Sequence, residues 1–139
     1  MEQTQLDKIY NFILELEVRD YELDSEKIVN NANYLHYMEH TRHKFCEKVG
    51  VTFISLVERG ITVVVRKVEI EYYHPLRSGE KFLSCLSLQR KGAKFVFLQD
   101  LYKISGEKIS SAQVSVVAVI NGKISRGDEL AEIFSDFIK

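Results

Sequence analysis

The sequence has few cysteines, no long apolar run and almost no net charge. Its 139 residues include only Cys46 and Cys85, too few for a disulfide framework, and each lies among apolar neighbours, which predicts two small core residues. No apolar run approaches the roughly 20 residues of a membrane span. The formal net charge of −1 gives no electrostatic reason to expect nucleic acid as a partner.

Targeting signals and domain boundaries are also lacking. The first residues, MEQTQLDK, have neither the basic nor the apolar region of a signal peptide. There are no internal repeats, low-complexity segments or linkers. A content of 45% hydrophobic and 28% charged residues is typical of a globular domain. We therefore expect residues 1–139 to form a single domain in the cytoplasm.

Hydrophobic periodicity predicts one strand, one long helix and four further strands. The first strand is expected over residues 9–18 and the long helix over residues 31–49, with Asn30 and Asn31 available as caps and Gly50 as the stop. A short helix, the four strands and a terminal amphipathic helix are expected over residues 52–59, 61–73, 81–90, 95–104, 109–120 and 127–139.

This order of elements predicts an α+β fold of two layers. Short connections make the four later strands antiparallel. The long helix has a broad apolar band, formed by Leu35, Met38, Phe45 and Val49 with a neighbouring row of Tyr34, Tyr37 and Thr41, and only Arg42 interrupts it. A helix that is apolar around much of its girth suggests a sheet curved about it.

A loop rich in carboxylates leads into the long helix. Unpaired N–H groups and the positive end of the dipole at a helix start favour an anion or a developing oxyanion. Asp24 lies seven residues before Asn31, and its ordinary interpretation is an acid that bonds turn N–H groups. Asp20 and Glu22 are expected to be solvated. No other stretch of the chain has as many features of a site.

Three motifs resemble those of hot-dog fold thioesterases, specifically the 4-hydroxybenzoyl-CoA thioesterase-like family. An Asp, a short turn, two apolar residues and Asn-Tyr are matched by Asp24, residues 28–29 and residues 33–34. The segments 18–24 and 28–32 are similar to the plant and bacterial acyl-ACP thioesterase branch. Residues 75–80 match the family's turn after the second strand. Lys27 stands where many relatives have Gly, and Asn31 where some have His.

The resemblance implies a fold, a reaction and an assembly. The fold is a curved five-stranded antiparallel sheet wrapped around one long central helix. Asp24 is expected to act as nucleophile or general base on an acyl thioester, with the backbone N–H of Asn31 polarising its carbonyl. Asn33 and Tyr34 are expected to bind substrate. Coenzyme A or phosphopantetheine enters as part of the acyl-CoA or acyl carrier protein substrate, no separate cofactor is expected, and the chain is expected to form a homodimer or homotetramer.

A basic hairpin turn offers a further candidate binding site. Arg90, Lys91 and Lys94 bracket the turn, and relatives use basic residues near the same strand end. The functional interpretation is contact with phosphates of coenzyme A or of the phosphopantetheine arm. The alternative is a solvated basic turn.

The sequence also offers alternative interpretations. Residues 36–40 read H-x-x-E-H, a zinc-protease pattern, but it lacks an identified third ligand, so no metal is expected. Glu39 could instead approach the thioester as a secondary polar group. A hot-dog protein that binds acyl thioesters or a protein partner without turnover is the main alternative to a hydrolase. A dehydratase or hydratase needs an acid–base pair, which Asn31 does not support.

Overall fold

A computed structural model describes residues 3–138 of the chain. The helices are α1 (Gln3–Ile9), α2 (Asn31–Val49), α3 (Phe53–Glu58) and α4 (Asp128–Ile133), with a 3-10 turn, η1, at Asp20–Glu22. The strands are β1 (Phe12–Glu17), β2 (Ile61–Tyr72), β3 (Lys81–Lys91), β4 (Lys94–Lys103), β5 (Lys108–Ile120) and β6 (Lys123–Ile124). Within the described residues, no helix is long and apolar enough to cross a lipid bilayer.

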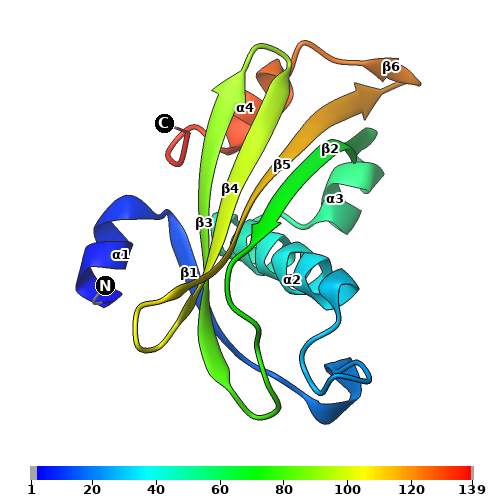
Figure 1. Cartoon of the computed structure of the whole chain (residues 1–139). Coiled ribbons are helices and arrows are strands. Elements are labelled where there is room, and N and C mark those ends of the chain that lie inside the picture. The colour runs from blue at the N-terminus through cyan, green and yellow to red at the C-terminus, as the bar shows by residue number, and fades with distance from the viewer. Residues whose placement is uncertain (1–2, 139) are drawn as a thin grey trace.

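Five long strands form one antiparallel sheet in the order β1-β3-β4-β5-β2, and the two-residue β6 pairs with β5. The sheet curves over α2, as Figure 1 shows. Strand β2 is an edge of this path, and its register with β5 shifts between Val65 and Lys67 because Arg66 forms a bulge. The architecture is the α+β arrangement predicted from the sequence, with β6 as a short addition.

Helix α2 forms because its ends are capped and one broad band is buried. The Asn30 side chain accepts from the Ala32 N–H at 3.0 Å, and Gly50 adopts φ +99° at the C-terminal end. Tyr34, Met38 and Phe45 are at most 3% exposed and pack into two clusters against the concave face of the sheet. The short helix α3 has the expected Thr52 cap, which accepts from the Ser55 N–H.

The ends of the chain differ from the sequence prediction. The strand predicted over residues 9–18 is shorter, because β1 begins at Phe12 and Ile9 is the last residue of helix α1. This helix was not predicted, and its Leu6 packs with Leu83, Cys85 and Tyr102 in a separate small cluster. Near the C-terminus, α4 ends at Ile133, and the chain then turns so that Ile138 forms a parallel bridge with Leu88. The helix predicted to reach Lys139 is therefore shorter, and Lys139 itself lies outside the described residues.

Candidate active site

Asp24 lies in a tight turn immediately before α2. The Asp24 N–H donates to the Ile28 carbonyl at 2.8 Å, and one oxygen of the Asp24 carboxylate accepts from the Glu26 N–H at 2.8 Å. Lys27 completes the turn with φ +62°, the left-handed conformation that glycine adopts without strain. This explains physically why glycine suits the position, and it shows that lysine can hold the same turn.

The turn is joined to the start of α2 by short backbone contacts. Leu23 and Val29 form an antiparallel bridge across it, and the Val29 N–H donates to the Leu76 carbonyl at 2.8 Å. Asn31 is the first residue of the helix, so its N–H is among those that the helical ladder cannot pair. Asp24 thus lies on a turn that is closed by the Leu23–Val29 bridge, and the chain enters α2 two residues after Val29.

Glu22 fastens the 3-10 turn to the first two turns of α2. Its carbonyl accepts from the Asn30 N–H at 3.0 Å and from the Asn33 side chain at 2.8 Å. Its carboxylate accepts from the Tyr37 hydroxyl at 2.9 Å and from the Arg19 N–H at 2.7 Å. The prediction of a solvated Glu22 is therefore wrong, because the residue is a structural anchor that sequence spacing does not reveal.

Two tyrosines, Tyr34 and Tyr72, lie beside this turn. The Tyr34 ring meets the Tyr72 ring edge-on at 5.1 Å, and the Tyr72 hydroxyl donates to the Asn31 carbonyl at 3.3 Å. Burial raises the pKa of the Tyr34 phenol; the Leu76 N–H that donates to its oxygen opposes the shift, and the charges of Glu80 and Asp24 add to it. Tyr72, at the end of β2, is a residue that the sequence analysis did not single out.

The remaining residues singled out in the loop and in the first turn of α2 have mainly structural contacts. Asn33 is held by its bond to the Glu22 carbonyl, and Tyr34 is 3% exposed. Asp20 is exposed and accepts a hydrogen bond from the Ser78 hydroxyl of the β2–β3 connection. Roles of Asn33 and Tyr34 in substrate binding stay predictions.

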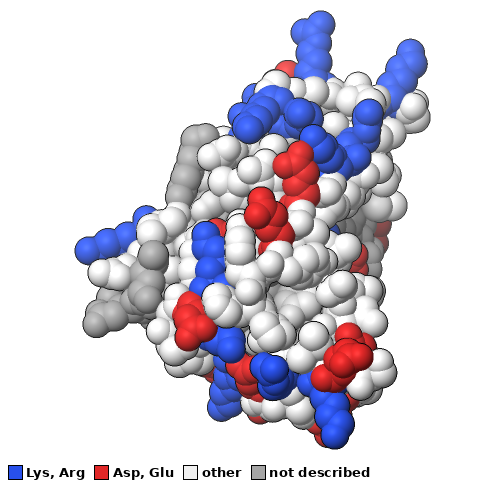
Figure 2. All heavy atoms as spheres, viewed as in Figure 1, with Lys and Arg blue, Asp and Glu red and all other residues white. Residues whose placement is uncertain are grey.

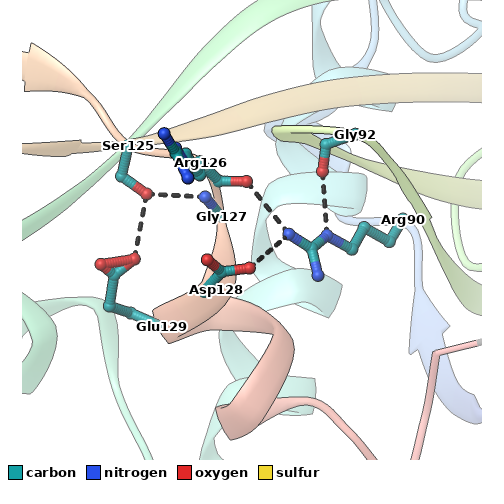
Figure 3. Close-up of polar contacts among 7 residues, drawn as sticks. All are labelled: Arg90, Gly92, Ser125, Arg126, Gly127, Asp128 and Glu129. Carbon is teal, nitrogen blue, oxygen red and sulfur yellow. Dashed lines mark hydrogen bonds and ion pairs between the residues drawn. The ribbon is translucent and has the colours of Figure 1, made fainter.

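Arg90 fastens the C-terminal segment to the basic hairpin. As Figure 3 shows, its guanidinium donates to the carbonyls of Gly92 and Arg126 and to the Asp128 carboxylate, all at 2.9–3.0 Å. Gly127 approaches the hairpin so closely that a Cβ there would lie 3.1 Å from the Ala93 carbonyl oxygen. Arg90 is therefore already occupied by protein partners.

Lys91 and Lys94 remain exposed at the same hairpin. Figure 2 shows Lys and Arg side chains gathered at the end of the molecule where the β3–β4 and β5–β6 hairpins lie. In Figure 1 this end is at the top, whereas the loop before α2 is at the bottom. Within one chain, the structure does not bring the basic hairpin and the Asp24 turn together.

The H-x-x-E-H residues lie on the exposed part of α2. His36 and His40 line a hollow of about 460 Å³ between α2 and β1, together with Glu22 and Tyr37. Glu39 lies on another flank, beside a second hollow of about 210 Å³. Among residues 3–138, no group of three or more His, Cys, Asp or Glu side chains is arranged to hold a metal ion.

Comparisons with known proteins give one consistent family. A family model described as the thioesterase-like superfamily matches residues 18–136. Acyl-acyl carrier protein thioesterase ATL3, chloroplastic, of Arabidopsis thaliana is 41% identical over 70 residues, which cover 50% of this chain and 37% of that protein. Putative acyl-CoA thioesterase YneP of Bacillus subtilis is 31% identical over 106 residues, covering 76% of this chain and 77% of that protein.

Solved structures share the fold over most of the chain. A hypothetical protein from Aquifex aeolicus has a TM-score of 0.81 at 30% identity, covering 88% of this chain and 98% of that one. A 1,4-dihydroxy-2-naphthoyl-CoA thioesterase from Synechocystis has a TM-score of 0.82 at 15% identity, covering 90% and 96%, which confirms the hot-dog fold alone. A second plant relative is acyl-acyl carrier protein thioesterase ATL2, chloroplastic, of Arabidopsis thaliana. The chain matches only 37% of the length of ATL3 and 51% of the length of ATL2.

Proposed function

The chain belongs to the thioesterase-like superfamily, and we therefore propose that it hydrolyses acyl thioesters to a free acid and a thiol. The substrate carries its acyl group on coenzyme A or on an acyl carrier protein, as the names of the relatives state for those proteins. The cytoplasmic location stays a prediction from the sequence, since the two plant relatives are named as chloroplastic.

The observation that supports this function most is the fixed position of the Asp24 turn against the start of α2. A thioester carbonyl oxygen at the first N–H groups of the helix, Asn31 foremost, gains stabilisation as negative charge develops on it. In one route the Asp24 carboxylate attacks the carbonyl carbon, the C–S bond breaks, and water then hydrolyses the resulting acyl–Asp24 anhydride to the free acid. In the other route Asp24 takes a proton from a water molecule that attacks the carbonyl carbon, and the C–S bond then breaks. In both routes a proton that derives from the water converts the departing thiolate to the thiol.

The proposal is tested by measuring free thiol release from a panel of acyl-CoA and acyl carrier protein substrates. At least one substrate is expected to turn over with saturation kinetics, and Asp24→Asn is expected to abolish most of the rate. Absence of thiol release from every substrate, by a protein that still binds them, would refute the hydrolase and leave a binding protein. The bond from the Glu26 N–H to Asp24 is the observation that favours this second candidate, because an acid with a purely structural role would form the same bond.

We also propose that two copies pair through the β2 edge. This strand is 12 residues long, yet apolar residues such as Val65 and Tyr72 remain 46% and 44% exposed. A long apolar edge is a pairing site unless another strand covers it. Sedimentation should show a dimer or a tetramer at micromolar concentration, and a strict monomer would refute the pairing.

Antiparallel pairing of two β2 edges would bring the basic end of one copy toward the Asp24 end of the other. Lys91 and Lys94 would then contact the phosphates of the bound coenzyme A or phosphopantetheine. Replacing both lysines with Ala should raise KM for acyl-CoA, and it should raise KM for a short thioester without the nucleotide much less. The difference in KM between wild type and variant on acyl-CoA should become smaller as salt is added. Lys44→Ala on α2 is the matched control, and equal losses on both substrates would indicate a structural role instead.

A further inference from the structure

Arg42 is a buried cation that forms an ion pair with no carboxylate among residues 3–138. The residue is 8% exposed, and its guanidinium donates to the neutral Gln99 side chain at 2.9 Å. Gln99 in turn donates to the Met38 carbonyl at 2.9 Å, which fixes the amide. Gln99 is a single neutral acceptor for a group with five N–H donors. A buried charge of this kind ordinarily has a counter-ion.

Arg42 lines an open hollow with apolar walls. The hollow of about 210 Å³ lies between α2, α3, β2 and β5, and its apolar side is formed by Phe53, Val63, Val65 and Val116. Glu39 and His43 stand at its mouth and are exposed. Burial lowers the pKa of Arg42 and the charge of Glu39 only opposes that shift, so the protein compensates the buried charge incompletely.

The hollow lies on the flank of α2 that begins at the candidate active site. Asn31, Leu35 and Arg42 are spaced by four and seven residues, so they share one face of the helix. Tyr72, at the end of β2, bonds to Asn31, whereas Val63 and Val65, nearer its start, line the hollow. Strand β2 therefore runs along this flank of α2. Leu35 and Val68, which lie between Asn31 and the hollow, are each 39% exposed.

The distance along this flank suits an acyl chain. Gln99 links the Arg42 guanidinium to the Met38 carbonyl, so the guanidinium lies near the level of Met38, one turn before its own Cα. Met38 is seven residues after Asn31, which at 1.5 Å per residue is about 10 Å. A thioester held at Asn31 can thus extend a medium-length acyl chain over Leu35 to Arg42.

We propose that this hollow receives the far end of the acyl group and that Arg42 binds a terminal carboxylate there. The inference rests on the proposed thioesterase function and names its substrate class, the monothioesters of dicarboxylic acids. A guanidinium offers a planar fork that matches both oxygens of a carboxylate, whereas a neutral oxygen would leave the buried charge uncompensated. The apolar walls receive the methylene groups of the chain.

The test is calorimetric binding of two inert thioethers, S-octyl-CoA and its ω-carboxy counterpart. The wild-type protein is expected to bind the carboxylate form at least about tenfold more tightly, the worth of a charge-assisted hydrogen bond. Arg42→Gln should abolish the preference, Arg42→Lys should keep part of it, and Arg59→Gln at the exposed end of α3 should leave it unchanged. Equal binding of the two thioethers by the wild type would overturn the inference, even if the Arg42 variants did not fold.

Measured rates of hydrolysis distinguish a failure of this inference from a failure of the proposed thioesterase function. Suberoyl-CoA should be cleaved with a higher kcat/KM than octanoyl-CoA. Cleavage of both at equal efficiency would refute the role of Arg42 and leave the thioesterase intact. A preference in thioether binding without cleavage of any acyl-CoA or acyl carrier protein would refute the thioesterase and leave the binding site.

Discussion

Replacing Asp24 with Asn is the sharpest test of the candidate active site. The substitution removes the charge but keeps an oxygen that can accept from the Glu26 N–H at the observed 2.8 Å. The turn should therefore persist, with a change in unfolding free energy below about 1 kcal/mol. Loss of a positioned acid–base group should lower kcat by ~10²–10⁴-fold, or about 3–5 kcal/mol of activation free energy.

The assay is initial-rate thiol release on the best substrate found, with urea unfolding of the same preparations. Asp20→Asn is the matched control, because Asp20 is an exposed acid of the same loop that only accepts from Ser78. It should retain near wild-type kcat. If Asp24→Asn kept more than about a third of kcat while the control behaved as expected, Asp24 would have no catalytic role and Glu39 would be the next residue to replace.

Four further outcomes are expected. Glu22→Ala should lose about 2 kcal/mol in urea unfolding, because two hydrogen bonds to its carboxylate disappear; an unchanged midpoint would contradict the anchoring. Arg90→Ala should cost about 1–2 kcal/mol in the same measurement, with kcat on a short thioester unchanged. Lys27→Gly should raise the unfolding free energy by about 1 kcal/mol by relieving the left-handed backbone. Burial raises the thiol pKa of Cys46 and Cys85 to about 12, so a disulfide reagent at pH 8 should label neither until urea is added, and rapid labelling of the native protein would refute their burial.

The strands and the long helix could be predicted because their signals are local. Alternation in residues 81–90, the Gly-containing turn and the apolar residues that open segment 95–104 specify the β3–β4 hairpin without help from distant residues. The N-terminal helix was not predicted, and Ile9, which was assigned to the strand although it breaks its alternation, is the last residue of α1. The packing of Leu6 with Cys85 and Tyr102 supports α1, and those partners lie far along the chain.

The sequence predicted that Asp24 lies close to the start of α2, but it did not predict the hydrogen bonds that hold these segments in place. Asp24 and the start of α2 carry a short motif, so sequence spacing sufficed to place them near each other. Glu22 acts through four partners, and Arg90 binds Asp128, which is 38 residues away. Such pairings depend on tertiary structure, so the sequence could not distinguish these anchors from solvated charges.

The fastening of the 3-10 turn by Glu22 has a consequence for how substrate is recognised. Because backbone and side-chain bonds both hold the segment between Arg19 and Asn33, its conformational entropy is lost on folding and not on binding. Binding energy from the acyl chain and the carrier is then free to act on the reacting bond rather than on ordering a loop. The Ser25 and Glu26 side chains are exposed and take no part in this framework, so they can be replaced without loss of the fold.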